Sequence, residues 1–455
     1  MNLEYFFNPK SVAIIGASHT KGKIGYNILE NFVKGNFKGK VYPVNPNTKP
    51  ILGKKVYPSI KEIPENVDLA VIAIPAKKVP KVLKECVEKK VKAVVIVSGG
   101  FSEIGEKGKK LEEKLKKIIK KSRTRVMGTN CLGVYDPYTN VDTIFNPREK
   151  SGRPSKGKIG FISQSGSIGI TILDWLAEAG IGISKFISYE NAIDVNECDA
   201  LEFLGKDRKT KVITIFLEGV KDGKRFIEVA RKVSKKKPII ALKGGKTQAG
   251  KKAVLSHTAA LAGFSKIYSS VFKQLKIIET KSWEELFDFA KAFLQPLPKG
   301  NRIAIITDGG GFGVLAADEC EKQGLKLPEP SKKLKRIFRK IFPEFASFKN
   351  PIDLTGNATS EMYRTAIEEC LKSNEYDGVI VIALFQVPAL GEELINVLVK
   401  AKKYKKPIVC CSTGGEITQK ISKTIEKNGI PVYISPERAA RAMAALVYYS
   451  SLLKK

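Results

Sequence analysis

The sequence predicts an α/β protein with parallel sheets, arranged as three successive domains. Short, continuous apolar runs alternate with Lys- and Glu-rich segments of helical periodicity, and this alternation restarts twice along the chain. Strands that are apolar throughout are typical of a parallel sheet covered by helices on both faces. The chain of 455 residues is long enough for about two to four domains. We expect the domains to cover residues 1–150, 151–298 and 299–455.

The first domain is predicted to be a doubly wound sheet that ends at a polar linker, Asn146–Lys158. Its helices are expected near residues 23–34, 76–89 and 106–121. Its strands are predicted at Ser11–Ile15, Val41–Val44, Leu69–Ile74, Ala93–Val97 and Arg125–Met127.

The same pattern returns in the second and third domains, which a linker at Gln295–Gly300 separates. Strands of the second domain are predicted at Ile159–Ile162, Ile183–Ile187, Val212–Leu217 and Pro238–Leu242, with helices near 167–179, 198–206, 222–235 and 282–294. Strands of the third are predicted at Ile303–Thr307, Val379–Leu384, Ile408–Cys411 and Val432–Ile434. The last helix begins at Ser435, a serine cap followed by a proline at the first helical position.

Charge and cysteine content limit the classes of partner. Lys and Arg number 79 against 46 for Asp and Glu, a net charge of +33, which suits either an anion-binding surface or a lysine-rich solvated surface. We favour the second interpretation and expect no nucleic-acid partner, because the lysines are spread over helix faces without one aromatic-flanked patch. The cysteines are scattered and form no C-x-x-C pair, so we expect no bound metal. The sequence has no signal peptide and no apolar span of about 20 residues, so we expect a cytoplasmic protein without a membrane anchor.

Two strand-to-helix turns are candidate anion sites. In the first, Gly16 ends a strand, and Gly22 and Gly25 open the next helix. Backbone amides at a helix start suit a phosphate, although the spacing fits neither the dinucleotide fingerprint nor Walker A. In the second, Ser165 and Gly166 begin a helix within GFISQSGSIG; this is either a phosphate cradle or an ordinary serine cap.

A histidine and a glutamate are candidates for catalysis. Only His19 and His257 are present, and His257 lies among small residues in SHTAALAG. Such surroundings would let a bulky group approach, although a lone histidine is more often structural. Glu218 follows an apolar strand, so it either orients an imidazole or caps the next turn.

Eleven segments in fixed order carry a resemblance to a known family: FNPKSVAIIGAS, YPVNP, VIAIPA, VSGGF, GTNCLGV, ISQSG, EGVKDG, KGG, SHTAALAG, TDGGGFGV and NPIDLTG. The chain resembles the nucleoside-diphosphate-forming acyl-CoA synthetases, relatives of succinyl-CoA synthetase, and among them the archaeal ADP-forming acetyl-CoA branch. The resemblance implies a Rossmann-like CoA-binding domain followed by two flavodoxin-like, doubly wound domains. It also implies conversion of acyl-CoA, ADP and phosphate into acid, CoA and ATP, through an acyl phosphate and a phosphohistidine.

The resemblance assigns roles to individual residues. His257 matches the phosphorylated histidine, Glu218 the glutamate that holds it, and Ser165 and Gly166 the phosphate cradle. The positions that match the CoA cleft are Gly16, Ala17, Ser18, Lys23, Val44, Asn45, Ile74, Pro75, Ser98, Gly99 and Asn130. Two departures affect the acyl pocket: Thr129 stands where the family has proline, and Glu190 where it has glycine.

The resemblance also implies a partner. The chain contains neither a Walker motif nor an ATP-grasp signature, so ADP or ATP with magnesium is expected on a separate ATP-grasp β subunit, in an α2β2 assembly. Coenzyme A is the substrate expected on this chain. The alternatives are the α subunit of a broader-specificity or succinyl-type synthetase, or a non-catalytic CoA-binding scaffold, which would need neither His257 nor Glu218.

Overall fold

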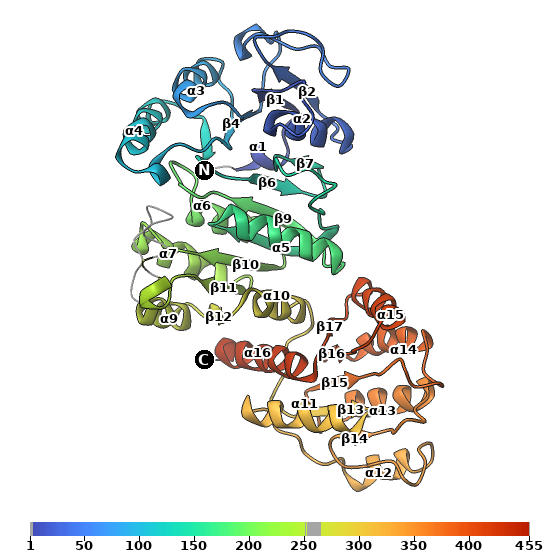
Figure 1. The fold of residues 1–455 in the computed structure, drawn as a ribbon. Helices are drawn as coiled ribbons and strands as arrows, with labels where there is room; N and C mark the ends of the chain where they lie inside the picture. Colours follow the sequence, from blue (N-terminus) through green and yellow to red (C-terminus); the bar gives the residue numbers. More distant parts are fainter. Residues whose placement is uncertain (1–2, 251, 253–264, 455) are drawn as a thin grey trace. The chain divides into compact units, whose positions relative to one another are not determined.

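The computed structural model describes residues 3–250, 252 and 265–454, and in this part of the chain it contains three β-sheets flanked by helices (Figure 1). Five strands of each sheet follow the order second, first, third, fourth and fifth along the chain. That order is typical of doubly wound α/β folds, which bind ligands at the carboxyl ends of their strands. The predicted fold class, with three α/β sheets in succession, is confirmed.

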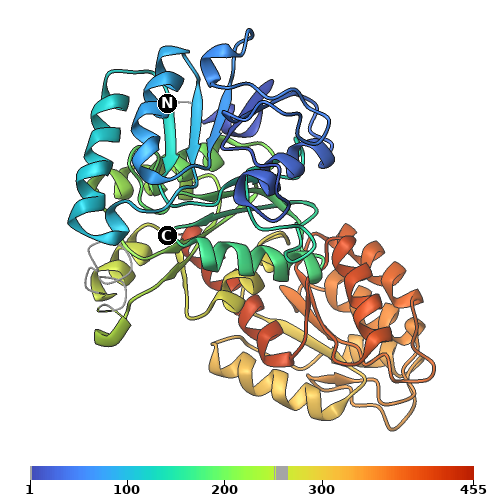
Figure 2. The same cartoon turned by 45° about the horizontal axis from the view of Figure 1, so that its top comes forward.

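The first sheet has the order β2-β1-β3-β4-β5, and its strands are parallel. The elements are α1 (Glu4–Phe7), β1 (Ser11–Ile15), α2 (Ile24–Lys34), β2 (Lys40–Val44), β3 (Leu69–Ile72), α3 (Val79–Glu88), β4 (Ala93–Ile96), α4 (Glu106–Lys120) and β5 (Arg125–Gly128). Helices α3 and α4 lie together on one face of the sheet, as Figures 1 and 2 show, where Leu83 and Leu115 pack with Ile72. Helices α1 and α2 cover the other face.

The second sheet has the order β12-β11-β10-β8-β9-β6-β7. Its elements are β6 (Gly133–Asp136), β7 (Val141–Asp142), β8 (Lys156–Ser163), α5 (Gly166–Glu178), β9 (Ile183–Ser188), α6 (Glu197–Lys206), β10 (Val212–Leu217), α7 (Gly223–Ser234), β11 (Ile239–Lys243), α9 (Ser265–Gln274) and β12 (Ile278–Thr280). Strands β8 to β11 are parallel, whereas β6 and β7 add an antiparallel edge that was not predicted. This edge comes from residues before position 150.

The third sheet has the order β14-β13-β15-β16-β17, with parallel strands. Its elements are α10 (Trp283–Ala292), β13 (Ile303–Thr307), α11 (Gly310–Lys322), α12 (Lys332–Phe338), β14 (Ile352–Asp353), α13 (Ser360–Lys372), β15 (Gly378–Ile382), α14 (Glu393–Ala401), β16 (Ile408–Cys411), α15 (Glu416–Lys427), β17 (Val432–Tyr433) and α16 (Pro436–Lys454). Helix α16 packs against both α10 and α11, and Figure 2 shows α11 and α16 side by side. Arg438 of α16 holds Asp288 of α10 through two hydrogen bonds of 2.6 and 2.8 Å.

The chain divides into two compact units, residues 1–279 and 280–455, and the first unit contains two of the sheets. The segment after β9 runs along β5 of the first sheet. Ile193 N–H donates to Gly128 O at 2.9 Å, and Val195 N–H donates to Val126 O at 3.0 Å. Arg125 Nε lies 2.8 Å from Asp194 Oδ2 beside them. The predicted domain boundaries at 150/151 and 298/299 stay predictions.

Among the described residues, no helix combines the length and apolarity needed to cross a membrane.

Candidate functional site

The predicted CoA positions lie at the carboxyl ends of all five strands of the first sheet, and hydrogen bonds connect them. Gly16 N–H donates to Val44 O at 2.9 Å, and Asn45 Nδ2 donates to Ala17 O at 2.7 Å. These bonds join the turn after β1 to the turn after β2. The sequence therefore places one continuous rim of turns at the edge where doubly wound sheets bind ligands.

The same rim continues across the turns after β3, β4 and β5. Ser98 Oγ donates to Ile74 O at 2.6 Å, and it also accepts from Ile74 N–H at 3.2 Å. Asn130 N–H donates to Ser98 O at 3.0 Å. Pro75 and Gly99 are exposed at this rim.

Gly16 needs to be glycine for two independent reasons. Its φ is +92°, in the left-handed region that other residues rarely adopt. A Cβ built at this position would lie 2.3 Å from Ala73 O, well inside van der Waals contact. The backbone of the turn thus runs directly against the end of β3, and the exposed Lys23 follows it at the start of α2.

The second predicted site, at the start of α5, is not an ordinary serine cap. Ser165 occupies the N-cap position, but its side chain makes no capping hydrogen bond to the first turn of the helix. Its Oγ lies 3.2 Å from Ser167 Oγ instead. The first-turn amides of a helix need an acceptor, and their usual serine partner does not supply it here. This favours the anion cradle over the cap.

Gln164 connects the α5 turn to Glu218. The Oε1 atom of Gln164 accepts hydrogen bonds from Glu218 N–H at 2.7 Å and from Gly219 N–H at 3.0 Å. The buried ammonium of Lys243 donates to Glu218 O at 2.9 Å. Glu218 is only 7% exposed, and hydrogen bonds to both its N–H and its carbonyl oxygen fix its backbone beside Gln164.

Glu190 brings a second carboxyl group to the start of α5. Its Oε1 accepts a hydrogen bond from Ser188 Oγ at 3.1 Å, and the Gly166 N–H also donates to the carboxylate. A Cβ at Gly166 would lie 2.4 Å from Glu190 Oε1, so the Glu190 carboxyl group occupies the space beside the cradle glycine. Burial, together with the charges of Glu218 and Glu103, raises the pKa of Glu190 to about 8.

The loop that carries Glu190 is tied to the rim of the first sheet. Asn191 Nδ2 donates to Glu103 Oε2 at 2.7 Å and to Thr129 Oγ1 at 3.0 Å. Glu103 follows the turn after β4, and Thr129 precedes Asn130. Lys221 Nζ donates to Asn191 O at 2.8 Å. The first unit therefore brings the two predicted sites, the CoA rim and the α5 cradle, next to each other.

His257 lies outside the described residues, so its position relative to Glu218 remains a prediction. Four residues of the described site were not predicted as site residues: Gln164, Glu190, Asn191 and Lys243. Two of them stand out in the sequence. Gln164 lies within the SQSG segment, and Glu190 stands out as a charged residue at a turn position where the family has glycine.

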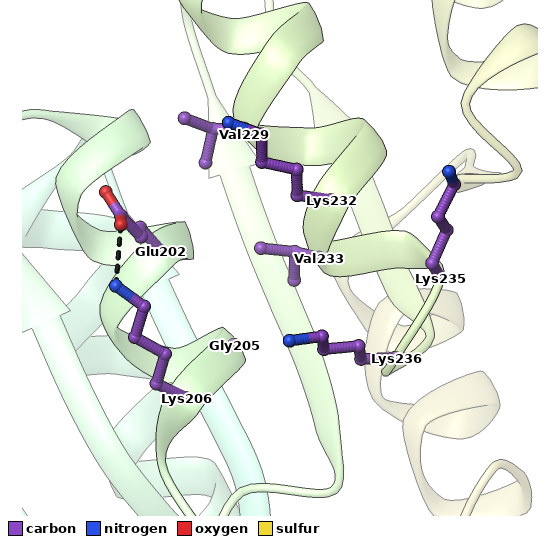
Figure 3. A pocket seen from close by; sticks show the side chains of 8 residues that line it. All are labelled: Glu202, Gly205, Lys206, Val229, Lys232, Val233, Lys235 and Lys236. Atoms are coloured by element: carbon purple, nitrogen blue, oxygen red, sulfur yellow. Dashed lines mark hydrogen bonds and ion pairs between the residues drawn. The ribbon is translucent and has the colours of Figure 1, made fainter.

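A groove between α6 and α7 is separate from both sites. It has a volume of about 360 Å³ and an apolar floor that includes Val229 and Val233, with four lysines around it (Figure 3). The Lys206 ammonium pairs with Glu202 at 2.7 Å. Helices α6 and α7 begin at the edge of the sheet where the strands end, which is the edge of the predicted sites. The groove lies at the C-terminal ends of these helices, and hence at the opposite edge of the sheet. No predicted site residue lines it.

Comparison with known proteins accounts for all three sheets. Residues 10–137 match the family described as CoA binding domain, residues 156–293 the Succinyl-CoA ligase like flavodoxin domain, and residues 303–449 the Ligase-CoA domain. The α subunit of Pyrococcus furiosus acetate–CoA ligase [ADP-forming] II is 44% identical, over 98% of this chain and 97% of its own length. The chain belongs to the family of ADP-forming acetate–CoA ligase α subunits. The resemblance inferred from the motifs is confirmed.

Two further relatives are similar to this ligase α subunit along its whole length. The ADP-forming acetate–CoA ligase of Methanocaldococcus jannaschii is 42% identical over the whole chain, which spans 64% of that longer protein. The solved structure of Ca. Korarchaeum cryptofilum dinucleotide forming acetyl-coenzyme A synthetase 1, in complex with phosphate and ADP, superimposes with a TM-score of 0.91. The two chains are 38% identical, and the match covers 98% of the Korarchaeum chain and 100% of the ligase α subunit.

Proposed function

We propose that this chain is the catalytic α subunit of an ADP-forming acetate–CoA ligase. The observation that carries the proposal is the adjacency of two sites within the first unit: a rim of strand-end turns for CoA, and a helix start that its N-cap serine side chain does not cap, for phosphate. The 44% identity to an α subunit of such a ligase supports it. Seven buried free cysteines fit the cytoplasm, where disulfides are rare.

In the proposed reaction, a phosphate oxygen attacks the acetyl thioester carbonyl. The carbon–sulfur bond breaks, CoA leaves as a thiolate that takes up a proton, and acetyl phosphate forms. A ring nitrogen of His257 then attacks phosphorus, and acetate leaves with the electrons of the broken phosphorus–oxygen bond. Glu218 would hold the imidazole by hydrogen bonding, and helix amides would stabilise the transferred phosphoryl group.

The transfer to ADP would take place with a partner. We infer a β subunit of the ATP-grasp class that carries ADP or ATP with magnesium, in an α2β2 assembly. The relative from P. furiosus is itself an α subunit, and the longer single-chain relative extends well beyond the length that this chain matches.

The deciding experiment uses radiolabelled phosphate and acetyl-CoA with the full chain alone. We expect protein-bound phosphate that is acid-labile and alkali-stable, in at most stoichiometric amounts. The variant His257→Ala should lose the label and retain CoA binding. The variant His19→Ala is the matched control, because His19 is the only other histidine and is exposed, with its Nε2 2.9 Å from Lys49 O. Full labelling of His257→Ala would refute the proposed function, and a non-catalytic scaffold would give no label in any variant.

A further inference from the structure

The start of α5 already has a carboxyl group resting on it. Glu190 Oε1 accepts from Ser188 Oγ at 3.1 Å and is contacted by the Gly166 N–H, the first amide of the helix. The space beside Gly166 is filled by this oxygen, because a Cβ there would come within 2.4 Å of it. An anion that binds to these amides therefore binds in contact with Glu190.

The backbone of the loop holds Glu190 in that place. Glu190 and Ala192 have φ angles of +42° and +51°, both in the left-handed region, and neither is glycine. The Asn191 side chain between them is fixed by Glu103 and Thr129. The carboxyl group is thus part of a built turn rather than a mobile surface side chain.

The charged neighbours that act most on Glu190 are acidic. They are Glu218 at the end of β10 and Glu103 after β4. Cys131, whose thiol donates to Ile96 O at 3.5 Å, has its pKa raised far above its usual range by burial, so it stays neutral. Lys221, bound to the carbonyl of Asn191, has its pKa lowered by burial. A phosphate dianion arriving here would face strong repulsion from an ionised Glu190.

We propose that Glu190 is a phosphate-binding residue that contacts the anion as a neutral carboxylic acid, donating its proton in a hydrogen bond to a phosphate oxygen. The inference rests on the proposed function, which places phosphate at this helix start. When Glu190 is ionised, phosphate binding is coupled to the uptake of one proton from the solvent. This proton forms the carboxyl O–H bond, and no other bond forms or breaks.

The direction of the pH effect follows from the titration of Glu190. Its pKa of about 8 lies far above the ordinary range, so below neutral pH the group is protonated and ready to bind. Above that pKa each pH unit should weaken phosphate binding by about tenfold, because only the shrinking protonated fraction binds. Between pH 7 and 9.5 the loss should reach roughly 30-fold.

The test is calorimetric titration of the full chain with inorganic phosphate, from pH 7 to 9.5, in two buffers of different ionisation enthalpy. The variant Glu190→Gln keeps the shape and cannot ionise, so its affinity should match that of wild type at pH 7 and stay nearly flat. Wild type should take up about 0.9 proton per phosphate at pH 9, and Glu190→Gln close to none. Any titration of Lys221 is common to both proteins and cancels in the comparison.

The variant Glu228→Gln is the matched control, because Glu228 is an exposed carboxylate on α7 away from the cradle; it should follow wild type. The inference is overturned if Glu190→Gln loses affinity as steeply as wild type, or if wild type takes up no proton at pH 9. Failure of the proposed function looks different: wild type would then bind no phosphate even at pH 7 and would acquire no label from acetyl-CoA and phosphate.

Discussion

Replacing Gly16 with alanine tests the turn after β1, on which the proposed CoA site depends. The left-handed φ of +92° should cost about 1–2 kcal/mol for any residue with a side chain. The new Cβ would also meet Ala73 O at 2.3 Å and Ile74 Cγ2 at 2.7 Å, so the turn must move off β3. Overpacking of this kind adds about 1–3 kcal/mol. We expect the free energy of unfolding to fall by about 2–5 kcal/mol in total.

Gly53 separates the two contributions. Its φ is +72°, but a Cβ there would meet nothing within 4 Å. The variant Gly53→Ala should therefore lose only the conformational part, about 1–2 kcal/mol, in urea titrations of both proteins.

CoA affinity gives the functional readout. The shifted amides of Gly16→Ala should weaken CoA binding by at least about tenfold, equivalent to about 1.4 kcal/mol. Gly53→Ala should bind CoA like wild type. The reasoning is refuted if Gly16→Ala binds CoA with unchanged affinity, or if the two variants lose the same stability.

Two further variants test other parts of the chain. Glu218→Gln should reduce ATP formation with the partner subunit by roughly 10–100-fold while CoA binding is retained, the range for carboxylates that orient a histidine; an unchanged rate would leave Glu218 a structural role. Arg438→Leu should lower the free energy of unfolding by about 3–5 kcal/mol in urea, because Asp288, whose side chain is 3% exposed, loses its bidentate cation. Arg364→Leu is its control, with an exposed partner in Glu361, and should change little; equal losses would contradict the argument.

The strands buried on both faces were predictable from the sequence, whereas the short edge strands β7 and β14 were not. Ser11–Ile15, Val212–Leu217 and Ile408–Cys411 begin and end where the apolar runs do. Strands β7 and β14 contain two residues each, and each ends in aspartate. Such segments become strands only because a neighbouring strand pairs with them through hydrogen bonds. The local sequence pattern carries no information about that pairing partner.

The same distinction applies to the candidate site. Site positions at strand ends could be predicted, because the carboxyl ends of parallel strands lie at one edge of the sheet. The turns after β1 to β5 do lie together at that edge. The contact of Glu190 with Gly166 could not be predicted. It depends on how two loops of the second sheet and one of the first fold over each other, through Asn191 and residues far away in the sequence.

The segment that follows β9 has a consequence for how the first unit can be divided. By pairing with Val126 and Gly128 it covers the outer side of β5, the last strand of its sheet. Exposed edge strands present unpaired amides and carbonyls that readily pair with another molecule, and natural proteins shield them. A fragment that stops at residue 150 would uncover this side of an apolar strand and would also leave β6 without its partner β9. The edge strand β5 of the sheet with the proposed CoA site is therefore shielded by the part of the chain that carries the proposed phosphate site.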